Sequence, residues 1–144
     1  AGSIDATPID VAFAMKAEDE GFRRLLYLGD IIELPLSGIA VMDKKLQIQR
    51  EQVKRVIRAS LRGSRFMKQN RAETIQMLSD YLRITPSQAA KAYDTSINSF
   101  TDDGMISDKG VSLDVQLTKE RLKITKEIPL SQLVDWSLVK EVNK

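Results

Sequence analysis

Ser3-Ile4-Asp5-Ala6 followed by Thr7-Pro8-Ile9-Asp10 is the stretch from which the fold can be predicted. The first four residues are short and extended in character, which favours a strand. Thr7 can cap a helix, Pro8 suits its first turn, and Asp10 stands three residues after Thr7, as a capping box requires. The junction therefore predicts a strand that leads directly into a helix N-terminus, a polar corner of the kind where α/β proteins bind ligands.

The composition is that of a globular protein, with 42% hydrophobic and 29% charged residues and a net charge of +2. The chain has no Cys, which excludes disulfides and thiolate chemistry, and no His, which removes the commonest metal ligand and general base. No apolar run approaches a membrane span, and no signal-peptide pattern is present. We therefore expect no metal site and no cofactor.

The chain divides into two regions of different pattern. Residues 1–43 alternate strand, helix, strand, strand, and we expect the helix from Pro8 to about Asp19 and the later strands over 24–28 and 37–42. From Lys45 onward almost everything is helical. The expected helices cover about 49–69, a segment that starts at Asn70, one that opens with Thr85-Pro86-Ser87-Gln88, residues 111–123, and a short turn and helix within 129–142.

Four groups of residues occur in an order that is known from one protein family. Ile4-Asp5-Ala6 comes first, then the Thr7-Pro8 turn, then Leu36-Ser37-Gly38, then the basic helix Glu51-Gln52-Val53-Lys54-Arg55-Val56-Ile57-Arg58-Ala59. This order resembles the C-terminal part of the periplasmic solute-binding proteins of ABC importers, in the branch that binds nitrate, sulfonates, taurine and thiamine precursors. Later segments with counterparts in that family are 70–75, 89–93 and 129–135.

The resemblance implies an α/β fragment of the type II periplasmic-binding-protein fold, with few strands on the N-terminal side and a helix-rich C-terminal half. Residues 1–33 would form the end of lobe two, as strand, helix and strand. Residues 34–144 would form the return crossover and the C-terminal part of lobe one. Because the chain opens directly on a strand–helix junction, we expect it to be the second part of a larger fold, whose uncovered core faces favour self-association.

The function that the resemblance implies is capture without catalysis. The protein would be the solute-binding component of an ABC-type importer, periplasmic or at the cell surface. It would hold a small organic or anionic ligand in a cleft between lobes and deliver it to the membrane permease. The ligand's identity stays open, since the cleft takes its polar groups from both lobes.

Five residues are the candidates for contact with that ligand. Thr7, Pro8 and Ile9 could use the N–H groups at a helix start and the Thr hydroxyl, although an ordinary helix cap explains them as well. Ser37 and Gly38 could place a hydroxyl and a backbone N–H at the cleft, and Gly38 would permit close approach of the backbone. A simple bend in the crossover is the alternative for this pair.

The long helix carries a basic stripe, which opens a second class of function. Arginines and lysines stand at helical spacing at positions 50, 54, 58, 62 and 65. A solvated outer face is the simplest interpretation, and a basic helical interaction module or contact with acidic surfaces of a transporter partner are alternatives. We expect no nucleic-acid partner, because the net charge is small, no aromatic residue is interleaved and no nucleic-acid-binding motif is present.

An enzyme is the remaining alternative. Asp5 and Asp10 could be a pair of catalytic carboxylates, but Asp10 as a cap partner and Asp5 on the polar side of a strand explain both more simply. The same fold family includes a thiamine-pyrimidine synthase branch, which depends on histidine and cysteine chemistry that this chain lacks. We therefore expect no catalytic residue here.

Overall fold

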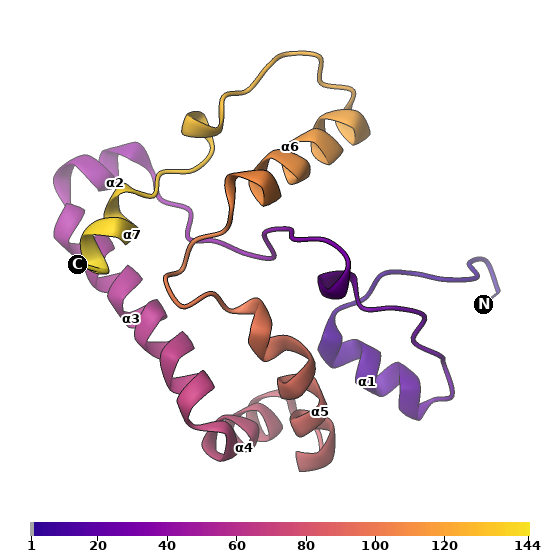
Figure 1. Ribbon diagram of the computed structural model, residues 1–144. Coiled ribbons are helices and arrows are strands. Elements are labelled where there is room, and N and C mark those ends of the chain that lie inside the picture. Colours follow the sequence, from indigo (N-terminus) through magenta and orange to yellow (C-terminus); the bar gives the residue numbers. More distant parts are fainter. Residues whose placement is uncertain (1) are drawn as a thin grey trace. The chain divides into compact units, whose positions relative to one another are not determined.

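The computed structural model describes residues 2–144, except for the side chain of Ala12; Ala1, where the predicted segment 1–33 begins, lies outside the described residues. Every regular element in this part of the chain is a helix (Figure 1). The α-helices are α1 (Val11–Asp19), α2 (Asp43–Ile48), α3 (Arg50–Gln69), α4 (Arg71–Leu82), α5 (Pro86–Ser96), α6 (Asp108–Leu122) and α7 (Ser137–Val142). Short 3₁₀ turns are η1 (Leu28–Asp30), η2 (Ile97–Ser99) and η3 (Leu130–Gln132).

The predicted α/β fold is wrong. Residues 3–6, 24–27 and 37–42, where strands were expected, have no regular structure, and the described part of the chain contains no sheet. A strand is stable only when neighbouring strands satisfy its backbone and cover one of its faces, so a β-like sequence pattern does not suffice without a partner. Apolar side chains of these segments consequently remain exposed, among them Leu25, Ile39 and Met42.

The chain forms two compact units, each made of two stretches of sequence. Unit 1 contains the residues up to Tyr27 together with Met67–Phe100, and unit 2 contains Leu28–Phe66 together with Thr101–Lys144. Each unit has a small apolar core of its own.

The core of unit 1 lies around α5, which packs against α4 and α1. Met15 of α1 and Ala89 and Tyr93 of α5 are buried. The helix starts with the predicted capping box: Thr85 Oγ1 accepts a hydrogen bond from the Gln88 N–H at 3.3 Å, and Gln88 Oε1 accepts one from the Thr85 N–H at 2.8 Å. The prediction of a helix start at Thr85 is confirmed.

The core of unit 2 lies along α3. Val53, Ile57 and Leu61 form the predicted stripe, and all three are buried with Leu138 of α7. The four-residue spacing places them on one face of the helix, so the contact with α7 covers all of them together. The predicted helix over about 49–69 is confirmed as α3.

Candidate functional site

Thr7, Pro8 and Ile9 lie in unit 1, just before α1. The helix begins at Val11, three residues later than the start predicted at Pro8, and the Ala14 N–H donates to the Asp10 carbonyl at 2.8 Å. The Thr7 hydroxyl donates to the Pro8 carbonyl at 3.3 Å, a local contact that leaves the side chain exposed. All three candidate residues are exposed.

Exposed apolar residues stand near this first group in the sequence. Ile4, Ile9 and Phe13 expose much of their side chains, with 65% of Phe13 accessible. Walls of small-molecule sites typically combine apolar surface of this kind with a few polar groups that fix the ligand's orientation.

Ser37 and Gly38 lie in unit 2, in the irregular segment between η1 and α2. Both are exposed, and the apolar neighbours Leu36 and Ile39 are exposed beside them, Leu36 to 87%. A Cβ placed on Gly38 would meet no atom within 4 Å, so no packing contact requires glycine at this position. The two groups of candidates belong to different units, and the prediction that they form one site stays a prediction.

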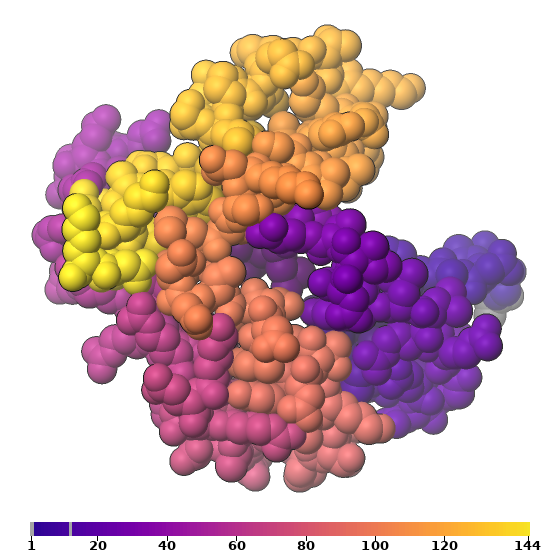
Figure 2. All heavy atoms as spheres, in the orientation of Figure 1, coloured from indigo at the N-terminus to yellow at the C-terminus, as the bar shows by residue number. Residues whose placement is uncertain are grey.

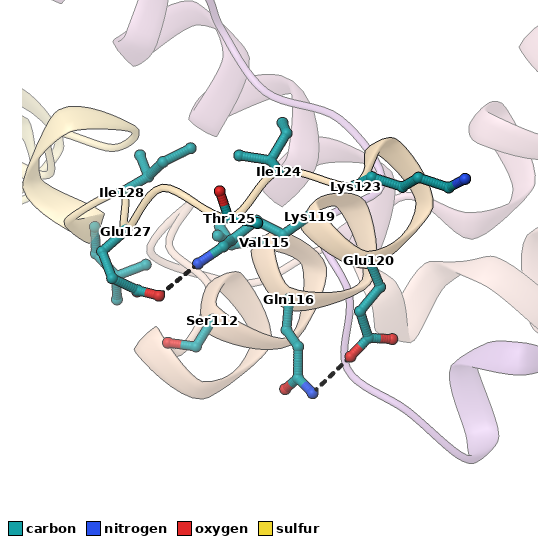
Figure 3. A pocket seen from close by; sticks show the side chains of 11 residues that line it. Ser112, Val115, Gln116, Lys119, Glu120, Lys123, Ile124, Thr125, Glu127 and Ile128 are labelled. Atoms are coloured by element: carbon teal, nitrogen blue, oxygen red, sulfur yellow. Dashed lines mark hydrogen bonds and ion pairs between the residues drawn. The ribbon is translucent and has the colours of Figure 1, made fainter.

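An open pocket of about 620 Å³ lies beside the C-terminal half of α6 and was not predicted (Figure 3). The chain turns back after Lys123, whose left-handed backbone (φ 54°) ends the helix. The wall combines apolar and polar side chains: Ser112, Val115, Gln116, Lys119, Glu120, Lys123, Ile124, Thr125, Glu127, Ile128 and Leu130. No motif marks these residues in the sequence, because each is an ordinary surface residue of a helix or loop.

The charges in the pocket are partly neutralised. Lys119 Nζ lies 2.7 Å from Glu127 Oε1, and Gln116 donates to Glu120 at 3.0 Å. The ammonium group of Lys123 points away from the Lys119–Glu127 pair (Figure 3). The pocket therefore offers hydrogen-bonding groups with mixed charge rather than a concentrated positive field.

The predicted basic stripe is divided in the structure. Arg50 and Lys54 both form ion pairs with Glu141 of α7, and Arg65 Nη2 donates to Asn143 Oδ1 at 3.0 Å. The hydrogen bond from Arg50 is the largest cause that holds the pKa of Glu141 below its usual value. These three cations of the stripe thus attach the C-terminal segment to α3.

A second carboxylate of unit 2 organises the start of α6. Glu33 accepts hydrogen bonds from the Ser107 hydroxyl at 2.8 Å and the Ser107 N–H at 3.1 Å, which lower the pKa of Glu33. The same hydroxyl accepts a bond from the Gly110 N–H at 3.1 Å and so caps the helix. The role of this cluster is structural.

Among the residues that the structure describes, no three or more Asp, Glu, His or Cys side chains are grouped as metal ligands. None of the described helices is both long enough and apolar enough to cross a membrane. The chain matches no known protein-family model, no curated protein and no solved structure.

Proposed function

We propose that this chain is the solute-binding component of an ABC-type importer, which captures a small organic or anionic ligand without catalysis. The ligand contacts would come from Thr7, Pro8, Ile9, Ser37 and Gly38. The proposal uses these residues and their surroundings and does not depend on a sheet. On this proposal the protein works in the periplasm or at the cell surface and delivers its ligand to a membrane permease.

One observation carries the proposal: each group of candidate residues has an exposed hydroxyl with exposed apolar residues close to it in the sequence. Thr7 offers a hydroxyl between Ile4 and Ile9 in the sequence, and Ser37 offers one between Leu36 and Ile39. A solute that covers such surface gains from burial of apolar area, and the hydroxyl and N–H groups supply direction. The order of the segments 4–6, 7–8, 36–38 and 51–59 resembles that of the solute-binding proteins, and this supports the proposal independently of exposure.

The experiment that tests the proposal is native mass spectrometry of the purified chain with a panel of nitrate, alkylsulfonates, taurine and pyrimidines. We expect an adduct of defined mass with one class of solute, and a rise in the thermal midpoint that grows with solute concentration. The same measurement shows whether the chain forms dimers, as the exposed apolar surface predicts.

Variants locate the ligand. Thr7→Val and Ser37→Ala should each weaken binding of the solute about five- to thirtyfold, since a lost hydrogen bond to a ligand costs about 1–2 kcal/mol. Thr101→Val and Ser87→Ala are the matched controls, as they remove exposed hydroxyls elsewhere. If Lys119→Gln abolishes binding of the solute and Thr7→Val does not, the solute binds in the α6 pocket. No adduct with any solute of the panel would contradict the proposed function.

A further inference from the structure

The outer face of α3 carries a second regular stripe, distinct from the buried one. It consists of Gln52, Val56, Ala59, Gly63 and Phe66, which we call the outer seam. The spacing of four, three, four and three residues is that of a coiled-coil seam. Every member is exposed, Val56 to 48% and Phe66 to 40%.

The middle of the outer seam is open and small. A Cβ placed on Gly63 would meet nothing within 4 Å, and Ala59 lies one turn before it. Small side chains flanked by larger ones let a second helix approach closely at the centre and contact Val56 and Phe66 at either end. The seam is about 21 Å long at 1.5 Å per residue, the length of two heptads. Part of α3 is visible on the surface in Figure 2, in magenta.

Positive charge flanks one side of this seam. In heptad terms Val56 and Gly63 occupy position a of the outer seam. Arg55 and Arg62 precede them directly and so occupy position g, where coiled coils carry the charges that select a partner. Both arginines are exposed, and neither forms an ion pair with a described residue. Arg50, Lys54 and Arg65, in contrast, hold α7 on the other face.

We propose that the outer seam of α3 docks an acidic amphipathic helix of a partner protein, with carboxylates of that helix opposite Arg55 and Arg62. Charge complementarity selects this occupant. A second copy of α3 offers no acid to these arginines: a parallel copy presents Val53, Ser60 and Met67 there, and an antiparallel copy presents arginine again. A nucleic-acid backbone would bring phosphates to the arginines but nothing apolar to Val56 and Phe66.

The test uses the full chain and two synthetic peptides of three heptads with leucine at both seam positions. One peptide has glutamate at the flanking positions and the other has lysine. Fluorescence anisotropy at two salt concentrations should show binding of the glutamate peptide at least tenfold tighter than the lysine peptide, with the preference reduced at high salt.

Charge reversal makes the test specific. The double variant R55E/R62E should bind the glutamate peptide at least tenfold more weakly than the parent chain does, and it should bind the lysine peptide more tightly. R23E/R121E, which makes the same change of net charge away from α3, should behave as the parent chain. Far-UV circular dichroism verifies that each variant keeps its helices. Equal binding of both peptides, tighter binding of a DNA duplex than of the glutamate peptide, or a dimer that R55E/R62E abolishes would each overturn the proposal.

Discussion

Arg71 and Asp94 join α4 to α5 through a bidentate salt bridge. Arg71 Nε donates to Asp94 Oδ1 at 3.0 Å and Arg71 Nη2 donates to Asp94 Oδ2 at 2.8 Å. The guanidinium carbon also lies 5.7 Å from the centre of the Tyr93 ring, within the range of a cation–π contact. This parallel arrangement is the strongest form of arginine–carboxylate pair, and it connects α4 to α5 within unit 1.

The pair predicts a dependence of stability on pH. The hydrogen bond from Arg71 is the main cause that lowers the pKa of Asp94 from its ordinary value of 3.8. Since the folded pKa is below the unfolded one, the stabilisation is complete above the unfolded pKa and is lost as the pH falls through the folded value. Asp94→Asn should therefore lower the urea midpoint at pH 6 and show a smaller further decrease at pH 2.5 than the parent chain.

The control for that measurement is Asp30→Asn, whose carboxylate forms no ion pair with a described residue. This variant should follow the parent chain at both pH values. If the urea midpoint of Asp94→Asn falls as much as that of the parent chain between pH 6 and pH 2.5, the Arg71–Asp94 salt bridge does not contribute to folding.

The capping box of α5 predicts a loss of stability that is specific to one side chain. Thr85→Ala removes the hydroxyl that accepts from the Gln88 N–H and should cost about 1 kcal/mol of the free energy of unfolding. Thr85→Ser keeps the acceptor and should stay close to the parent. Denaturant unfolding followed by circular dichroism at 222 nm measures both; equal losses for the two variants would contradict the role of the hydroxyl.

The core of unit 2 predicts a larger loss. Leu61 is buried among Val53, Ile57 and Leu138, so Leu61→Ala removes buried methyl groups and should cost about 2–5 kcal/mol. Val56→Ala changes an exposed residue of the same helix and should stay within about 0.5 kcal/mol of the parent. Similar costs at both positions would mean that α3 does not bury the face assigned here.

The C-terminal ends of two helices predict substitutions that increase the free energy of unfolding. Arg83 closes α4 with φ 53° and Lys123 closes α6 with φ 54°, both in the left-handed region that glycine adopts without steric cost. Arg83→Gly should raise the free energy of unfolding by up to about 1 kcal/mol, after allowance for the greater freedom of glycine in the unfolded chain. Arg83→Ala keeps the steric cost and should bring no gain. The thermal midpoint of each variant checks the sign.

Helices were predictable from the sequence where their signals are local. The Thr85–Gln88 box and the recurrence of Val53, Ile57 and Leu61 depend on residues three or four positions apart, and both appear in the structure as predicted. The strands predicted over 24–28 and 37–42 are absent, because a strand depends on a partner elsewhere in the chain that local sequence does not reveal.

The candidate site shows the same limit. Thr7 to Ile9 and Ser37 to Gly38 are predicted from their neighbours in sequence, and all five are exposed in the structure. The α6 pocket could not be predicted, since it arises where the chain folds back after Lys123 and brings Glu127 to Lys119.

By itself the sequence determined that α5 begins after Thr85, which face of α3 is apolar and which chemistries the absence of Cys and His excludes. Only the tertiary structure decided which basic residues of α3 form ion pairs with α7. Glu141 lies far along the chain from Arg50 and Lys54 and reaches them because Leu138 packs on the buried face of α3. That contact leaves Arg55 and Arg62 exposed on the opposite side, because a helix presents one face to its core and the other to solvent.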